Sequence, residues 1–455
     1  MKNAPLVIVL SIGLLLASLG NGAIGYLKRI GLVERQVYDN YRVAYCDVPN
    51  GSQDSFANPC MCMRDPKPNT TGETQSTANA LPEPKYIYQN LGSHRWWKLS
   101  KDALFGGFIL LSLFLIRTGR ARLPEISALR PAIPLVASVA IGLAISLASW
   151  GVGFAAIGLR SFEFLAIVLL GSWAVGGMHY FARSVGWLLI IQAALAAIEL
   201  ILGIPLRVCP FSFRVAGTMV LPNSLGIVTV VALAFYASFS QNKTWLPMLL
   251  LAAIAILAVS GSGTGLVALF ALLAMLTLRR ISGSGKWVFA VAMVLLGAIM
   301  MVKLPSITQR PDIYDSLFAA GGRVEKFTEV LRTTNALDTL FGRGLGFGTN
   351  TSSNLVDLTS APLPSVMGTT EPFYADSTVT VLFTQMGILG IAAFYWLLGW
   401  AFLRDPVARP TYLVIGITSL TMNITELFPV NFLLGLLLAH TIFLSSRKPP
   451  EVPAP

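Results

Sequence analysis

One polar stretch, rich in arginine and glycine, is the part of the sequence that first suggests chemistry. The stretch 321–350 lies between two apolar runs and reads GGRVEKFTEVLRTTNALDTLFGRGLGFGTN. Arg323 opens its first half, in which apolar residues recur at roughly helical spacing, at Val324, Phe327, Leu331, Leu337 and Leu340. This spacing predicts an amphipathic helix with its apolar side on a bilayer and its charges facing away from it.

The second half of this stretch is rich in glycine. Glycine occupies positions 342, 344, 346 and 348, and Arg343 lies among them. Because glycine adopts positive φ angles freely and has no Cβ, such a backbone can approach a bulky ligand closely. Arg343, Gly344 and Gly346 are therefore candidates for substrate binding. The alternative interpretation is a surface helix with a flexible exit, since charges on a helix face are usually solvated.

Two arginines precede a helix start in the stretch 207–226, which reads RVCPFSFRVAGTMVLPNSLG. Pro222 and Asn223 break the chain here, so Asn223 or the serine after it is expected to cap a helix N-terminus. The free N–H groups of such a terminus attract an anion. Arg214 would add a bidentate fork to that site, and Arg207 is a candidate by location. The alternative is a helix-start turn whose arginines bind lipid headgroups.

Composition sets the class of protein. Of 455 residues, 54% are hydrophobic and only 12% are charged, and the mean hydropathy is +0.67. Because such a chain has too little charge to cover a globular surface, the sequence predicts a polytopic membrane protein. The net charge of +11 does not indicate a nucleic-acid partner, because many basic residues lie between apolar runs, where they orient helices and attract anionic lipid headgroups.

The apolar runs predict an all-α protein of about twelve transmembrane helices. The runs cover about 5–27, 103–116, 132–150, 162–178, 186–204, 225–240, 246–260, 264–278, 287–303, 376–402, 411–425 and 430–445. The first run fits either a signal peptide or a transmembrane helix. Its length, the absence of a clear cleavage site and the following Lys28 and Arg29 favour the helix. A short glycine-rich junction at 260–269, SGSGTGLVAL, is interpreted as helix packing.

Basic residues in short connections orient these helices, because lysine and arginine are in excess on the cytoplasmic side. With the N-terminus inside, the inner connections carry Arg117, Arg120, Arg122, Arg130, Arg183, Lys243, Arg279, Arg280, Lys286, Arg404 and Arg409. Both termini are then expected in the cytoplasm. Arg160, Arg207 and Arg214 lie in short outer connections, where topology does not require them, so they are candidates for substrate binding.

This orientation divides the chain into six parts. They are the first transmembrane helix 1–27, an extracytoplasmic loop 28–101, helices 2–9 in 102–303, a long extracytoplasmic loop 304–375, helices 10–12 in 376–445 and a cytoplasmic tail 446–455. All four cysteines fall on the outer side, at Cys46, Cys60, Cys62 and Cys209. An even number of cysteines in an oxidising compartment predicts one or two disulfides. No metal site is expected, because Cys-Met-Cys is a poor zinc spacing.

Taken together and in order, these motifs resemble those of the O-antigen ligase and O-antigen polymerase family of bacterial envelope enzymes. The motifs are Arg214 with Gly217-Thr218 and Pro222-Asn223, the Ser-Gly-Thr-Gly junction, and an outer loop with Gly-Gly-Arg and Gly-x-Gly-x-Gly that exits into YADSTVTVLFTQMGILGIAAF. The resemblance covers roughly 130–445 and leaves out the cysteine-bearing loop 28–101.

The resemblance implies a fold similar to that of GT-C glycosyltransferases and a metal-independent, cofactor-free glycosyl transfer at the outer face of the bacterial inner membrane. The donor would be an undecaprenyl-diphosphate-linked oligosaccharide. Arg214 and Arg323 match family motif positions and would hold the diphosphate and stabilise charge on the leaving group. A chain-length regulator and a flippase are the implied partners.

The family resemblance leaves two activities and the general base open. In the ligase branch a histidine near the end of the long loop activates the acceptor hydroxyl, whereas this chain has Glu371 and Asp376 in that region. This difference favours a polymerase of exopolysaccharide or O-antigen repeat units over an O-antigen ligase. Asp376 is expected to be the base, the partner of an arginine, or a helix cap.

A transporter or lipid flippase is the alternative outside enzymology. It would be expected to carry ionisable residues or broken helices near the membrane midplane. Glu163, Glu199, Asp376 and Glu426 instead fall near predicted outer ends of helices, which favours chemistry at one face. A synthase that uses cytosolic nucleotide sugars is excluded, because the inner connections are too short for a nucleotide-binding domain.

Overall fold

The computed structural model describes residues 3–29, 95–202, 206–209, 212–219, 221–283, 285–308, 313–314, 318, 323–349 and 377–446. Within these ranges the protein is helical apart from one antiparallel strand pair, formed by β1 (Leu206–Cys209) and β2 (Ser212–Arg214). Residues 30–94 of the predicted outer loop 28–101, the carboxylates at Glu371 and Asp376, and residues 447–455 of the predicted cytoplasmic tail lie outside the described residues. The two ends of the predicted loop are helical, in α1 (Ala4–Arg29) and α5 (Arg95–Arg117).

The described helices follow one another along the chain in the order of their labels. They are α1 (Ala4–Arg29), α5 (Arg95–Arg117), α6 (Ile126–Leu129), α7 (Ile133–Ser149), α8 (Val152–Arg160), α9 (Phe164–Leu170), α10 (Met178–Ile201), α11 (Pro222–Phe239), α12 (Leu246–Ser260), α13 (Gly263–Leu278), α14 (Gly285–Ile307), α16 (Arg323–Thr333), α17 (Ala336–Phe341), α19 (Thr378–Arg404), α20 (Arg409–Ser419) and α21 (Val430–Ser446). Three short 3-10 turns join them, at Arg130–Ala132, Gly171–Trp173 and Val175–Gly177.

Five helical runs in the described part of the chain are long and apolar enough to cross a membrane, a task that needs roughly 20 apolar residues. They are Ile126–Ser149, Val175–Ile201, Pro222–Phe239, Gly285–Ile307 and Thr378–Arg404. A sixth candidate is the pair Val152–Arg160 and Glu163–Trp173, whose halves are bent by 58°. The protein is therefore an all-helical membrane protein by composition, with five or six helices that could span a bilayer.

The twelve predicted apolar runs each overlap a helix, but the number of membrane spans is not confirmed. α12, α13 and α21 have 15, 16 and 17 residues, and α20 has 11, which is short for a bilayer of about 30 Å at 1.5 Å per residue. The predicted helix at 162–178 is wrong in its bounds. The chain there forms α9 and two 3-10 turns, and α10 begins at Met178.

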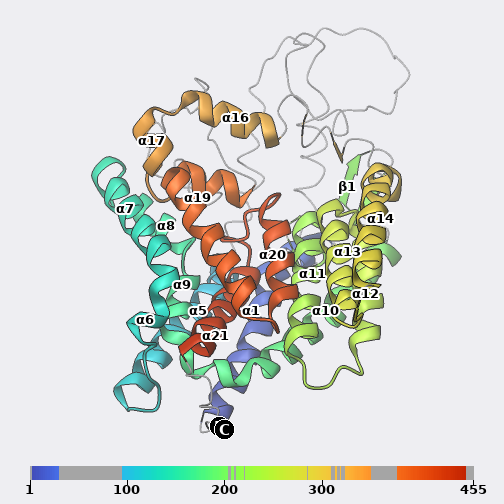
Figure 1. Ribbon diagram of the computed structural model, residues 1–455, viewed down its shortest axis with the longest axis horizontal. Helices are drawn as coiled ribbons and strands as arrows, with labels where there is room; N and C mark the ends of the chain where they lie inside the picture. Colours follow the sequence, from blue (N-terminus) through green and yellow to red (C-terminus); the bar gives the residue numbers. More distant parts are fainter. Residues whose placement is uncertain are drawn as a thin grey trace.

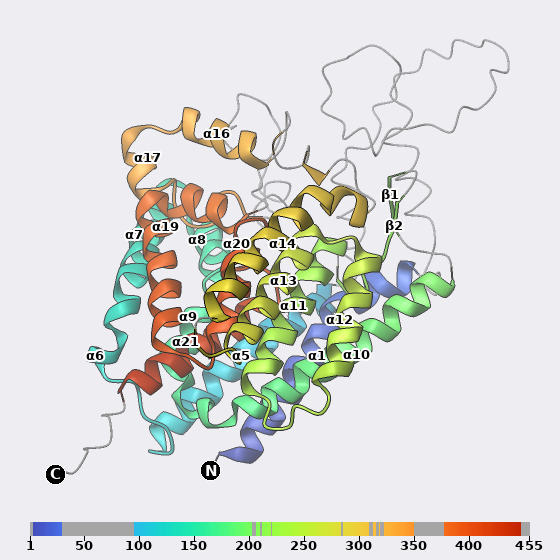
Figure 2. The same cartoon turned by 45° about the vertical axis from the view of Figure 1, so that its right-hand side comes forward.

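α11 is the centre of the bundle. It packs against α10, α12, α13 and α20, and 83% of its span is buried. α14 lies at the edge of the bundle, where only 6% of its span is buried against the rest of the protein. Both helices are apolar all round, which is typical of helices that face protein or lipid on every side. Figures 1 and 2 show α14 on the outside of α13.

The two ends of the bundle differ. α1 begins and α21 ends at one end, and the strand pair, α16 and α17 lie at the other (Figure 2). α16 and α17 cross above α19 at this second end (Figure 1). The N-terminal and C-terminal helices therefore start and finish on the same side, as the basic-residue pattern requires.

Asp405, directly after α19, ties three helices together at the first end. Its Oδ1 accepts hydrogen bonds from the N–H groups of Val407 and Ala408, both at 3.0 Å. Its Oδ2 lies 2.9 Å from His440 Nδ1 and accepts from Thr441 Oγ1 at 3.0 Å. Burial alone would raise the pKa of Asp405, but the bonds from His440, Ala408 and Thr441 outweigh it, and the pKa lies below its ordinary value.

Candidate functional site

Arg214, the last residue of β2, is buried against the C-terminal end of α12. Its Nε donates to the carbonyl of Ser260 at 2.6 Å, and its Nη2 donates to the carbonyl of Gly261 at 3.3 Å. Gly261 ends α12 in a left-handed conformation with φ of 58°. The last carbonyls of a helix lack partners and carry the negative end of its dipole, so a guanidinium is stabilised there.

Asn223 completes this group. Its Oδ1 accepts from Arg214 Nη2 at 2.7 Å. The predicted helix cap is wrong, because α11 begins at Pro222 after an N-cap residue, Leu221, that makes no side-chain cap bond. Asn223 is the second residue of the helix, so its side chain is available to orient the arginine. The structure thus brings Arg214 and Asn223 together with residues 260–265 of the glycine-rich junction 260–269. These residues are called the Arg214 group.

Two buried side chains of α10 hold the backbone that follows Arg214. Glu199 Oε2 accepts from the N–H groups of Ala216 at 2.9 Å and Gly217 at 3.4 Å. Gln192 Oε1 accepts from the N–H of Thr218 at 3.1 Å. Gly217 has φ of 54°, and a Cβ there would lie 2.3 Å from Gln192 Oε1, so glycine is required. The sequence placed Glu199 at an outer helix end but did not show that it supports the arginine motif.

α16 is the amphipathic helix expected after Arg323, which is its first residue and is partly buried. Val330 is buried, and the ring of Phe327 lies 5.4 Å from that of Phe383 on α19. α16 therefore packs on the N-terminal half of α19. The expected helix is split in two, because α16 ends at Thr333 and Asn335 caps α17. The predicted apolar positions that remain exposed are Val324 and Leu331 on α16 and Leu337 and Leu340 on α17.

The glycine-rich segment after α17 packs between helices. All four glycines have positive φ, from 72° at Gly348 to 103° at Gly344. A Cβ at Gly342 would lie 2.3 Å from the backbone of Gln385, and one at Gly346 would lie 2.4 Å from Phe154 O. The close approach that the sequence predicted is thus made to α19 and α8. Binding of a ligand by Gly344 and Gly346 stays a prediction.

This packing is possible because α19 is broken. Gly387, with φ of 64° and ψ of −161°, interrupts the helix, and the carbonyls of Thr384 and Gln385 accept instead from the N–H groups of Arg343 at 2.8 Å and Gly344 at 3.2 Å. These two carbonyls therefore keep hydrogen-bond partners despite the interruption of the helix. A single apolar run in the sequence gave no sign of it beyond the glycine itself.

Arg343 is engaged within its own loop. Its Nη2 donates to Thr333 O at 2.8 Å, its Nε lies 3.4 Å from Asp338 Oδ2, and its guanidinium lies 5.5 Å from the centre of the Phe347 ring. These contacts link α16, α17 and the glycine-rich segment. They favour a structural role, and its predicted contact with substrate stays a prediction.

Arg160 lies at the bend between α8 and α9 and is paired with carboxylates. Its Nη2 lies 2.7 Å from both oxygens of Asp102, and its Nε lies 3.0 Å from Asp102 Oδ1 and 3.9 Å from Glu163 Oε1. Ser161 donates to Glu426 Oε1 at 3.1 Å. Two carboxylates thus lie beside the Arg160 guanidinium, whereas the described bonds of Arg214 go to neutral oxygens.

Arg160, Asp102, Ser161 and Glu163 form a second polar group, the Arg160 group. The connection between α20 and α21, residues 420–429, joins the Arg214 group to it. Thr421 donates to Thr264 Oγ1, near the start of α13, at 2.8 Å. Thr378 Oγ1 donates to Met422 O at 2.8 Å and accepts from Ile424 N at 3.0 Å. Glu426 then contacts Ser161. Figure 1 shows α8 and the strand pair on opposite sides of α19 and α20, so this connection is the polar link between them.

Two predicted site residues lack described side chains. Arg207 lies in β1, where its backbone pairs with Phe213, and its side chain is outside the described residues. Asp376 lies outside them too, directly before Ser377, which caps α19 by accepting from Thr380 N at 3.2 Å. The cap role considered for Asp376 is thus filled by Ser377. Of the cysteines, only the backbone of Cys209 is described, in β1.

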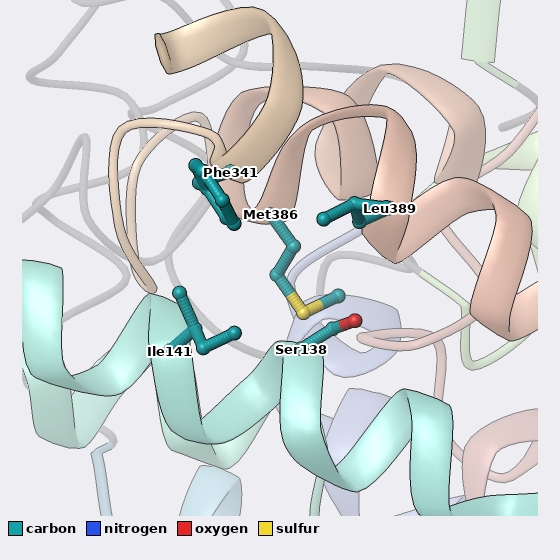
Figure 3. A pocket seen from close by; sticks show the side chains of 5 residues that line it. All are labelled: Ser138, Ile141, Phe341, Met386 and Leu389. Atoms are coloured by element: carbon teal, nitrogen blue, oxygen red, sulfur yellow. The ribbon is translucent and has the colours of Figure 1, made fainter.

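A small apolar recess lies beside the break in α19. It is lined by Ser138, Ile141, Phe341, Met386 and Leu389, which come from α7, α17 and α19 (Figure 3). None of these five side chains is ionisable, so the recess is not a site of acid–base chemistry.

No protein-family model matches the sequence, and no curated protein matches it.

Proposed function

We propose that the protein is a polymerase of lipid-linked oligosaccharide repeat units, acting at the outer face of a bacterial inner membrane in exopolysaccharide or O-antigen synthesis. The donor is an oligosaccharide linked to a polyprenyl diphosphate such as undecaprenyl diphosphate. The protein crosses the membrane about twelve times with both termini in the cytoplasm, and the shorter helices α12, α13, α20 and α21 complete the bundle. Membrane lipids surround it, and a flippase and a chain-length regulator act with it.

The Arg214 group is the observation that carries this proposal. Its guanidinium is buried, fixed in orientation by three bonds to neutral oxygens, and placed at the end of the bundle that bears α16 and the strand pair. A diphosphate headgroup lies at a membrane surface, and a planar guanidinium matches phosphate oxygens with paired N–H groups. Arg323, at the start of α16 on the same end, supplies the second positive charge.

The reaction needs charge stabilisation more than covalent chemistry. An acceptor hydroxyl attacks the anomeric carbon of the donor sugar, the bond between that carbon and the diphosphate oxygen breaks, and the hydroxyl proton passes to a base. The leaving diphosphate gains negative charge as the bond breaks, and Arg214 and Arg323 stabilise this charge. Asp376 is the proposed base.

Polymer synthesis by purified protein tests the proposal. Arg214→Ala and Arg323→Ala should each lower the rate roughly ten- to a hundredfold, since a charge-assisted hydrogen bond contributes about 1.5–3 kcal/mol. Arg323→Lys should be impaired almost as much, because lysine lacks the planar fork. Lys243→Ala, at an exposed position between α11 and α12, is the matched control for loss of one positive charge. Parental rate and polymer length in Arg323→Ala would overturn the proposal.

A lipid-linked oligosaccharide transporter is the second candidate, and two observations favour it. α8 and α9 are bent at Arg160 and Glu163, and α19 is interrupted at Gly387. Transporters often build substrate sites from interrupted helices with ionisable residues. Vesicles that contain the protein distinguish the two activities, because a polymerase lengthens the sugar chain and a transporter moves unchanged lipid-linked oligosaccharide across the bilayer.

A further inference from the structure

Three side chains on α9, α19 and the α20–α21 connection have buried polar atoms without a hydrogen-bond partner among the described residues. These atoms are both amide atoms of Gln385, the Nδ2 of Asn423 and the Oε2 of Glu163. Gln385 is fully buried and Asn423 is 5% exposed. An enclosed amide without a partner destabilises a fold and is rare in native proteins. Gln385 lacks a partner at both amide atoms, whereas Asn423 lacks one only at Nδ2, because its Oδ1 accepts from Thr425 Oγ1 at 2.7 Å. These unused groups indicate a role that the fold itself does not require.

The α20–α21 connection contacts the two helices, α19 and the bent α8–α9 pair, that carry Gln385 and Glu163. Asn423 lies in it, between the two residues whose backbone bonds to Thr378. Gln385 is seven residues after Thr378, so the two share a face of the N-terminal half of α19, about 10 Å apart along the helix. Glu163 lies two residues after Ser161, which bonds to Glu426 at the other end of the connection.

Two of these side chains lie at interruptions of helical structure: Glu163 at the bend between α8 and α9, and Gln385 two residues before Gly387. α8 and α9 are bent by 58°, α19 is broken at Gly387, and α20 stops after 11 residues. Irregular backbone at membrane depth is tolerated where protein buries it or where it lines a cavity for a substrate. Glu163 and Gln385 therefore combine polar atoms without partners with backbone of the kind that lines binding sites.

The atoms without partners include donors and acceptors, which selects the ligand chemistry. Asn423 Nδ2 and Gln385 Nε2 donate, whereas Gln385 Oε1 and Glu163 Oε2 accept. An anion would use only the donors and a metal cation only the acceptors. A hydroxyl group donates and accepts, and a saccharide offers several along its length.

We propose that Gln385 and Asn423 bind hydroxyl groups of the saccharide part of the lipid-linked substrate. This inference rests on the proposed function and extends it, because it separates recognition of the sugar from recognition of the diphosphate. The Arg214 group binds the diphosphate at the end of the bundle, and the α20–α21 connection, joined to that group through Thr421 and Thr264, binds the sugar. Glu163 supplies a further acceptor from α9.

Binding measurements with two lipids test the separation. The first lipid is the polyprenyl-diphosphate oligosaccharide extracted from host cells that lack this protein, and the second is undecaprenyl diphosphate without sugar. Gln385→Met and Asn423→Leu should each weaken binding of the first lipid roughly three- to tenfold, the effect of one or two neutral hydrogen bonds. Binding of the sugar-free lipid should not change, and the melting temperature should stay the same or rise.

Asn431→Leu is the matched control. Asn431 is buried in the same region, but its Nδ2 donates to Thr425 O at 3.3 Å and its Oδ1 accepts from Phe432 N at 2.8 Å. Its loss should lower the melting temperature. If Gln385→Met does not fold, Asn423→Leu decides the question alone.

The possible results separate this inference from the proposed function. Parental affinity of Gln385→Met and Asn423→Leu for the oligosaccharide lipid overturns the inference, and so does an equal loss of both lipids. If Arg214→Ala binds sugar-free undecaprenyl diphosphate as the parent does, the proposed function fails, while the contrast between the two lipids in the amide variants still decides the sugar site. If the parent binds neither lipid, both are wrong.

Discussion

Arg214 and Asn223 are joined by a 2.7 Å hydrogen bond from the guanidinium Nη2 to the amide Oδ1. The bond crosses from the end of a strand to the second residue of the central helix α11. Because Asn223 is neutral, it orients the arginine without offsetting its charge. This distinguishes the Arg214 group from the Arg160 group, where carboxylates of Asp102 and Glu163 offset the charge.

This bond predicts that Asn223→Asp and Asn223→Ala rank in opposite orders for ligand binding and for stability of the fold. Asn223→Asp should keep the contact and stabilise the fold at least as well as Asn223→Ala, because it pairs a buried charge. It should bind undecaprenyl diphosphate more weakly than Asn223→Ala, because its carboxylate neutralises Arg214 and repels the diphosphate. Dissociation constants and melting temperatures in detergent measure the two orders. Equal binding by Asn223→Asp and the parent would show that Arg214 does not contact the anion.

Two glycines of α8 predict how tightly the glycine-rich segment is docked. A Cβ at Gly158 would lie 2.1 Å from the backbone nitrogen of Gly346, whereas a Cβ at Gly153 would meet no atom within 4 Å. Gly158→Ala should therefore destabilise the protein by about 1–3 kcal/mol through overpacking. Gly153→Ala should stabilise it by about 0.5–1 kcal/mol, because alanine is the better helix former. Melting temperatures check both.

The contrast between the two variants is what tests the docking. The helix and the substitution are the same, so only the contact with the glycine-rich segment differs. A melting temperature of Gly158→Ala at or above that of Gly153→Ala would mean that the segment does not pack on α8 as described. A fall in polymer synthesis without a fall in melting temperature would instead indicate that the segment contacts the substrate.

The sequence predicted the helices well because composition determines them in an apolar environment. Each apolar run overlaps a helix, and the polar run after Arg323 forms two helices, α16 and α17, where one amphipathic helix was expected. The interruptions were less visible. The bend at Arg160 lies where the sequence has Arg-Ser-Phe-Glu beside an apolar run, and the predicted helix at 162–178 passed over the turns that follow it.

Partners distant in the chain were out of reach of sequence reasoning. Arg160 lies 58 residues from Asp102, and Arg214 lies 46 residues from Ser260. Residue types showed that these arginines were not needed for topology, but not whether carboxylates or carbonyls would meet them. That difference separates the described contacts of Arg160, which include carboxylates, from those of Arg214, which are to neutral oxygens. The amides of Gln385 and Asn423 gave no signal at all, because each is an ordinary polar residue in an apolar run.

Asp405 predicts a pH-dependent loss of stability. Its pKa is lower in the folded protein than its ordinary value, so its bonds contribute stability above the unfolded pKa of about 3.9 and lose it as pH falls through the folded value. Asp405→Asn should lower stability by about 1–3 kcal/mol at neutral pH, since it places a donor against His440 and Thr441. The difference from the parent should shrink below about pH 4. Melting temperatures from pH 7 to pH 3 measure it, and a constant difference would contradict this account.

The last prediction concerns the orientation of the protein in the membrane. At one end of the bundle Arg279, directly after α13, donates to Pro406 O in the α19–α20 connection. The connection after α13 and the α19–α20 connection both have basic residues in or beside them, and both are expected on the cytoplasmic side. Epitope tags after Gly283 and Pro453 should be protected from protease in intact spheroplasts, and tags after Ala80 and Ser360 should be cleaved. The Arg214 group lies toward the opposite end, with the strand pair. Cleavage at Gly283 with protection at Ala80 would show that the protein has the opposite orientation. Arg214 and Arg323 would then lie on the cytoplasmic side, which excludes a lipid-linked donor that is bound at the outer face.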